Sequence, residues 1–235
     1  MDQQQHKRST MAGFSLIEML IAMTVTIVLL GASMTLLAEG FKIRGRAESM
    51  SDAAADAQRA LNIMSREIAN AGFNLTTNGI VAGDSDLTHL RIRSNLNRYD
   101  PLASTASRNG VVDAGEDVKW YVNDAENTDY LVRYDINVPP PNNRTVLANR
   151  LSSLRFHYFA QKVTYSTGTT SATNCDISNP SAAEVPSDQA RYLVIAVCVQ
   201  LPAVGVPNQP GYQPAGFPMM LVSDVSLRNG NLNDY

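Results

Sequence analysis

Glu18 is the side chain whose position most needs a chemical explanation, because it is the only charged residue in the apolar run 14–37. An ionised acid in a helix costs about 2.5–3.5 kcal/mol at the centre of a bilayer on insertion scales, and less near a helix end. The residue can be an acid tolerated at the membrane edge or a charge that awaits a cation. A free α-amino group at Phe14, on the same chain or a neighbour, would be such a cation if residues 1–13 were removed.

A second group of oxygen-bearing residues lies in the segment 109–116. Its spacing fits positions five to twelve of an EF-hand-type loop, although the residues at positions one and three, Thr105 and Ser107, are not acids. An Asn-Gly turn that opens a hairpin, with solvated acids, is the alternative interpretation. The candidate calcium ligands are Asn109, Val111, Asp113 and Glu116.

Catalysis finds little support in the sequence. The histidines are His6, His89 and His157, and they belong to no recognisable metal-binding or nucleophile motif. His157 lies in an aromatic strand pattern, which is typical of a packed or surface histidine. We therefore expect a protein that is not an enzyme and that needs no cofactor, calcium aside.

The element that must position Glu18 is the apolar run itself. As a helix, residues 14–37 would be roughly 36 Å long, enough to cross a hydrocarbon core of about 30 Å with some tilt. Lys7 and Arg8 precede the run, and positive charge beside a single span is held on the cytoplasmic side. An ordinary signal peptide is the alternative, but its apolar region has about 7–15 residues. The rest of the chain is therefore expected outside the cytoplasm.

Cys175 and Cys198 are separated by 23 positions, and an oxidising compartment favours pairing them. The expected role is a staple for a long loop rich in Ser, Thr and Asn. A free reactive thiol is the alternative, although no CxxC motif supports redox chemistry.

Beyond the apolar run, apolar residues recur at steps of three and four, which predicts one face of an amphipathic helix. The pattern ends at residues 70–72, where Gly72 suits a left-handed C-terminal cap. The small residues on the face favour packing on the chain's own sheet, and a coiled-coil dimer is the rival interpretation. The predicted face consists of Ala47, Met50, Ala54, Ala57, Leu61, Met64, Ile68 and Ala71.

Six later segments are rich in β-branched and aromatic residues and are separated by Gly, Pro, Asn and Asp. A helix followed by strands indicates an α+β fold, here a long N-terminal helix packed on an antiparallel β-sheet. Long loops are expected at 166–186 and 202–218. The predicted strands are 87–94, 118–122, 130–136, 153–164, 192–201 and 219–227.

The string GFSLIEMLIA at residues 13–22 resembles the processing site of type IV prepilins and of type II secretion pseudopilins. The resemblance implies that a prepilin peptidase cuts after Gly13 and methylates the new terminus at Phe14. It also implies that Glu18 pairs with a terminal amine of a neighbouring subunit during assembly. Many pilins close a C-terminal loop with a disulfide, which agrees with pairing of Cys175 and Cys198.

The resemblance also divides the chain and suggests its place in the cell. Residues 1–13 would be a cleaved leader, 14–38 a transmembrane and filament-core helix, 39–72 its amphipathic half, and 73–235 a β-rich periplasmic domain. The precursor would lie in the inner membrane, in contact with lipid, and would then enter a surface filament. The expected partners are the peptidase, an inner-membrane assembly platform, and other major and minor pilins.

Among pilin-like families, the later segments 65–73, 118–122 and 131–133 are similar to PilW-like minor pilins and to the larger J-type pseudopilins. We therefore predict a minor pilin of a type IV pilus. A minor pseudopilin of a type II secretion system and a single-pass, membrane-anchored periplasmic binding protein are the alternatives. Direct nucleic-acid binding is not expected, because the net charge is −3 and the pI is about 5.6.

Overall fold

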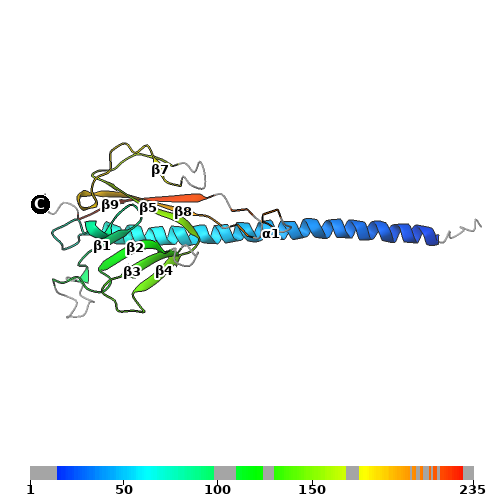
Figure 1. Cartoon of the computed structure of the whole chain (residues 1–235), viewed down its shortest axis with the longest axis horizontal. Coiled ribbons are helices and arrows are strands. Elements are labelled where there is room, and N and C mark those ends of the chain that lie inside the picture. Colours follow the sequence, from blue (N-terminus) through cyan, green and yellow to red (C-terminus); the bar gives the residue numbers. More distant parts are fainter. Residues whose placement is uncertain are drawn as a thin grey trace, which may run out of the picture. The chain divides into compact units, whose positions relative to one another are not determined.

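The computed structural model describes residues 15–97, 110–123, 130–167, 175–201, 203–204, 207–208, 212, 214–215 and 218–229. The chain forms two compact units, Met1–Glu48 and Ser49–Tyr235. The helix α1 (Leu16–Ala69) contributes to both units, whereas every β-strand belongs to the second (Figure 1). The fold is α+β, with one long helix and antiparallel sheets, as the sequence predicts.

The ends of α1 follow from local chemistry. At its start, the carbonyl oxygen of Ser15 accepts the N–H groups of Glu18 and Met19 at 3.0 and 3.1 Å. An acid in the first turn suits the positive end of the helix dipole. The helix ends at Ala69, and Gly72 has a φ of +77°, the left-handed conformation expected of its cap. The left-handed conformation predicted for Gly72 is therefore confirmed, but its N–H donates to the carbonyl oxygen of Arg93 at 2.9 Å and not to a carbonyl of the helix.

The first sheet, which we name sheet A, has four antiparallel strands in the order β1-β2-β3-β4. Three of the strands fall on predicted segments, whereas β4 was not predicted. Three of the five residues of β4 are exposed, so it lacks the buried, β-branched pattern that identified the others. The bounds are β1 (Leu90–Arg93), β2 (Asp117–Asn123), β3 (Tyr130–Asp135) and β4 (Arg144–Ala148).

The second sheet, sheet B, has three antiparallel strands in the order β5-β8-β9. They are β5 (Leu151–Phe159), β8 (Tyr192–Val199) and β9 (Met219–Ser226). The prediction that one strand extends to residue 164 is wrong, because β5 ends at Phe159 and the chain then turns away. The remaining short elements are β6 (Ser166–Thr167), β7 (Ile177–Ser178), η1 (Ala82–Asp84) and η3 (Ser187–Gln189).

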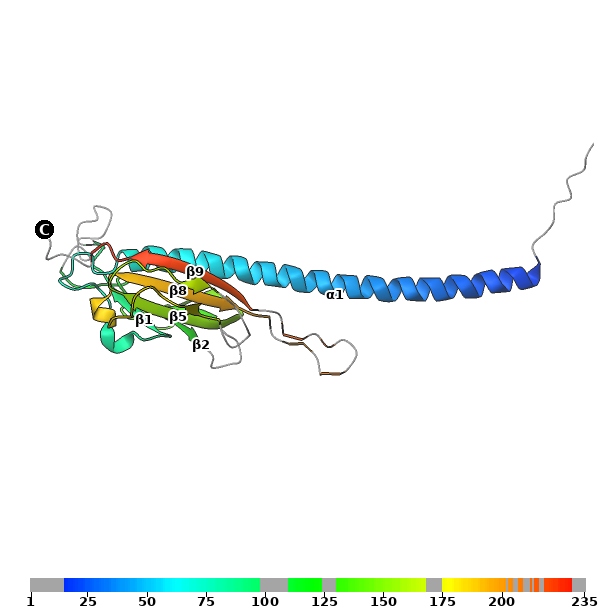
Figure 2. The same cartoon turned by 90° about the horizontal axis from the view of Figure 1, so that it is seen from above.

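In the second unit, α1 packs on the inner faces of both sheets and forms one hydrophobic core with them (Figure 2). Met64 and Ile68 of the helix, Trp120 of sheet A and Phe156 of sheet B are fully buried within it. Burial of such side chains stabilises the fold by about 1.5–3 kcal/mol each. The helix therefore packs on the chain's own sheets, as predicted.

The predicted helix face needs one correction. Ala47 is exposed, whereas Ala53 and Ala60, which lay outside the predicted face, are buried. The first buried side chain of α1 is Ala53, so Ala47 precedes the buried part of the helix. Ala60 is buried beside Leu61 because the helix contacts two sheets. A helix between two sheets buries a wider stripe of its surface than a helix that packs on a single sheet.

Candidate functional site

The candidate site is the N-terminal end of α1. Gly13 and Phe14 lie outside the described residues, so the predicted cleavage and methylation remain predictions. Glu18 lies in the first turn of α1 and its side chain is exposed. Within the part of the chain that the structure describes, Glu18 makes no ion pair.

The surface around Glu18 is apolar over several turns of the helix. Every large apolar side chain from Leu16 to Leu37 is exposed, from 52% for Val25 to 83% for Leu16. One window of α1 has a mean hydropathy of 2.2, so the helix is long and apolar enough to cross a membrane by length and composition. Such a surface fits membrane anchoring and is unlike the polar exposed face of a helix in a water-soluble protein.

Four hydroxyl side chains of this apolar segment are already hydrogen-bonded within the helix. Thr24 and Thr26 donate to the carbonyl oxygens of Ile21 and Ala22, at 2.8 and 2.7 Å. Ser33 and Thr35 donate in the same way to carbonyl oxygens one turn earlier, both at 2.8 Å. Polar groups paired in this way can enter an apolar environment at little cost. Glu18 is then the one charged group of this segment.

The two cysteines form a disulfide between Cys175 and Cys198, with Cα atoms 6.2 Å apart. This confirms the predicted pairing. Cys198 lies in β8 and is fully buried, on the side of sheet B opposite to the residues that face α1. The bond therefore holds the segment that begins at Cys175 against the outer face of sheet B.

The outer face of sheet B also contains a polar cluster that the sequence analysis did not find. His157 is buried as expected of a packed histidine, but both of its ring nitrogens lie beside carboxylates, those of Asp176 and Glu184. These acids lie 19 and 27 residues further along the chain, in a segment that carries no local signal of such contacts.

Of the candidate calcium ligands, Asn109 lies outside the described residues. Glu116 is buried, and its Oε1 and Oε2 accept the backbone N–H groups of Asn97 and Asp113 at 2.7 and 2.8 Å. Val111 is exposed. Among the described residues, no group of three or more His, Cys, Asp or Glu side chains is placed to hold a metal ion. Glu116 thus fastens the loop before β2, and calcium binding stays a prediction.

Comparison with known proteins gives one result for this end of the chain. Residues 8–34 match the family model described as the prokaryotic N-terminal methylation motif. The matched residues contain Gly13, Phe14 and Glu18 and reach into the exposed apolar part of α1. Searches of curated proteins and of solved structures found no match to the chain.

Proposed function

We propose that this type IV pilin-like chain is a minor pilin, a structural and assembly subunit of a type IV pilus. The methylation motif and the long helix packed on antiparallel sheets are both pilin-like. One observation carries the proposal: a single carboxylate, Glu18, stands in an exposed apolar helix within the methylation motif. The motif is that of a structural family, and the proposed role is non-enzymatic.

The proposed mechanism begins with the precursor held in the inner membrane by the apolar part of α1, with the globular domain in the periplasm. Prepilin peptidase cuts after Gly13 and methylates Phe14, which creates a cationic terminus. Glu18 then pairs with a terminal amine in the helical bundle of the growing filament. In that apolar interior an unpaired charge is costly, and removing one partner of a buried pair costs about 3–5 kcal/mol. Subunits that form the pair are thus selected for assembly.

The N-terminus of the native protein tests the processing step. Mass spectrometry of the chain purified from filaments should find N-methylated Phe14 as its first residue. A Gly13→Leu variant should accumulate as the uncleaved precursor in the membrane fraction. A chain that still begins at Met1 in a finished filament would overturn the proposal, as would normal cleavage of the Gly13→Leu variant.

A Glu18→Ala variant tests the assembly step separately. It should be cleaved normally but largely lost from purified filaments, as measured by immunoblot against the membrane pool. Glu39→Ala is the matched control, because Glu39 is also an exposed acid of α1 but lies outside the methylation motif. Equal incorporation of the two variants would contradict the role of Glu18.

Deletion of the protein from the cell distinguishes a type IV pilus subunit from a subunit of a type II secretion pseudopilus. Loss of surface filaments and of twitching supports the pilus assignment. Loss of hydrolase export with intact pili would instead assign the chain to a type II secretion pseudopilus.

A further inference from the structure

The outer face of sheet A carries a line of basic and aromatic side chains. The strand register pairs Arg91 with Lys119, Lys119 with Tyr134, and Tyr134 with Arg144, so the four residues cross all four strands in one row. Trp120, the neighbour of Lys119 in β2, is completely buried in the core around α1. Because side chains alternate along a strand, the row lies on the opposite face of the sheet.

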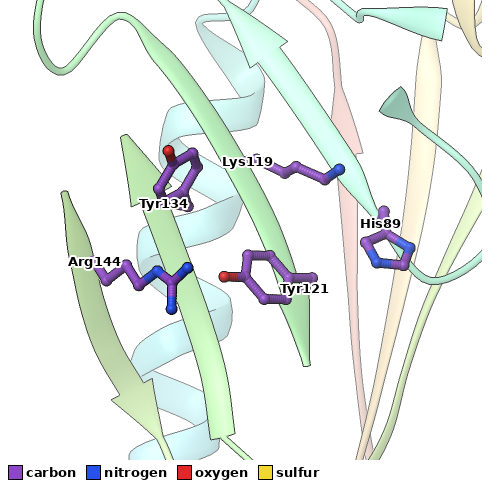
Figure 3. Close-up of a pocket in the computed structure, with 5 residues that line it drawn as sticks. All are labelled: His89, Lys119, Tyr121, Tyr134 and Arg144. Carbon is purple, nitrogen blue, oxygen red and sulfur yellow. The ribbon is translucent and has the colours of Figure 1, made fainter. Parts of the chain in front are cut away.

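A shallow pocket of about 230 Å³ opens on this face (Figure 3). Its rings are ordered: His89 stacks on Tyr121, with centroids 6.1 Å apart and planes 23° apart. The guanidinium carbon of Arg144 lies 5.8 Å from the ring centroid of Tyr134. Figure 3 shows the Tyr121 hydroxyl and the Arg144 guanidinium turned toward each other. The lining residues are His89, Lys119, Tyr121, Tyr134 and Arg144.

The cations of the row differ in their partners. Arg91 is held by Asp117 at 2.8 Å and by Asp84 at 2.5 Å. The Lys119 ammonium lies 3.6 Å from the same Asp84. Among the described residues, Arg144 makes no ion pair, and its side chain is exposed on the edge strand β4. Arg144 is therefore the cation of this face that is available to an external anion.

The pocket combines three recognition elements that suit one chemical class. His89 covers one face of Tyr121, and Arg144 covers one face of Tyr134. The opposite face of each ring carries partial negative charge and can pack against the C–H groups of a sugar ring. Arg144 presents a planar fork of donors that matches a carboxylate. The Tyr121 hydroxyl and the Lys119 ammonium can hydrogen-bond to ring hydroxyls. A volume below the usual 300–1,000 Å³ of ligand pockets suits a single ring.

We propose that this pocket binds an acidic sugar, a hydroxylated ring that carries a carboxylate, through Arg144 and the face of Tyr134 that Arg144 does not cover. A nucleic acid would use the same aromatic stacking but needs several cations along its backbone. Here Arg91 and Lys119 already share acidic partners, and the whole chain carries a net charge of −3. The proposal goes beyond assembly and does not depend on the role of Glu18.

Saturation-transfer NMR with glucuronate tests the proposal, using the full chain in micelles of a zwitterionic detergent that contains no sugar. Glucuronate should receive saturation at its ring protons, and glucose, which lacks the carboxylate, should receive much less. Arg144→Gln should weaken glucuronate binding about tenfold or more, the effect of losing a hydrogen-bonded contact between charged groups. Tyr134→Leu should weaken binding as well, whereas Tyr134→Phe should retain it. Arg59→Gln, at an exposed arginine of α1, is the control and should bind normally.

The outcomes that overturn the proposal are distinct. They are the absence of saturation transfer to glucuronate, equal transfer to glucose and glucuronate, and an equal loss of binding in Arg144→Gln and Arg59→Gln. Binding of oligothymidylate that depends on Arg144, without binding of glucuronate, would also overturn it and assign the face to nucleic acid. Circular dichroism of each variant establishes that it is folded, which is expected because Arg144 and Arg59 are exposed.

Discussion

The Nε2 atom of His157 in β5 lies 2.6 Å from Oδ1 of Asp176, the residue that directly follows Cys175 of the disulfide. On its other side, Nδ1 lies 2.7 Å from Oε1 of Glu184. The histidine side chain is 7% exposed, whereas the side chains of Asp176 and Glu184 are 29% and 46% exposed. The segment from Cys175 to Glu184 is thus fastened to the outer face of sheet B by a covalent bond and by two polar contacts to one ring.

Replacing His157 with leucine should loosen this segment. The change leaves the Asp176 and Glu184 carboxylates beside an apolar side chain, and we expect a loss of about 1–3 kcal/mol in the free energy of unfolding. Limited proteolysis should cleave the segment 175–186 faster than in the parent. His89→Leu is the control, because His89 is 41% exposed and its side-chain hydrogen bonds are to Thr88 and Asp86, not to the segment 175–186. Equal proteolysis of the two variants would show that His157 does not hold the segment.

Replacing both Cys175 and Cys198 with serine should destabilise the second unit by about 3 kcal/mol, the chain-entropy value for a loop of this length. Urea unfolding followed by circular dichroism measures the change. The same cysteine replacements made in the His157→Leu variant show whether the losses of stability from the disulfide and from His157 add. If the variant with Cys175→Ser and Cys198→Ser alone unfolds at the same urea concentration as the parent, the disulfide has no stabilising role.

Gly79 should not tolerate a side chain. Its φ is +80°, and an added Cβ would lie 2.5 Å from the carbonyl oxygen of Arg93 and overlap the backbone of Gly72. We expect Gly79→Ala to cost about 2–4 kcal/mol, because backbone strain and overpacking combine. Gly83→Ala is the matched control, since a Cβ there meets nothing within 4 Å. Thermal unfolding of the two variants should therefore differ clearly, and equal midpoints would refute the close approach at Gly79.

Asp117 should make the stability of the fold depend on acid pH. Burial raises the pKa of its carboxyl, but hydrogen bonds from Arg91 and Arg93 at 2.8 Å outweigh that effect, and the pKa is lowered from 3.8. Because the folded pKa is the lower one, the stabilisation is complete above the unfolded pKa. It is lost as the pH falls from about 4 through the folded pKa.

Urea unfolding at a series of acidic pH values measures this effect. Asp117→Asn should flatten the loss of stability below about pH 4, because the group that binds the proton has been removed. Arg93→Gln removes one of the two guanidinium partners of Asp117. Its free energy of unfolding should fall with decreasing pH less steeply than that of the parent and more steeply than that of Asp117→Asn. If the free energy of unfolding of Asp117→Asn falls with decreasing pH as steeply as that of the parent, Asp117 is not the group responsible.

Local patterns in the sequence predict much of this protein. The left-handed conformation of Gly72 could be predicted because the end of a helix depends on neighbouring residues, and the apolar run around Glu18 is visible as composition alone. The strands β2, β3, β8 and β9 were found for the same reason. The prediction was wrong at Ala47 and missed β4, where burial depends on which other elements are present.

The sequence by itself determined the N-terminal motif, the apolar helix and the α+β class, and it favoured the pairing of Cys175 with Cys198 that the structure shows. Only the tertiary structure decided which residues meet across the sheets. His157 finds carboxylates 19 and 27 residues away, and Lys119 lies beside Tyr134 because of the strand register. Helix periodicity and helix ends depend on residues a few positions apart, so they can be recognised in the sequence itself. Register and cross-strand contacts arise when the whole core packs, and a shift of one residue would turn every side chain of a strand to the other face.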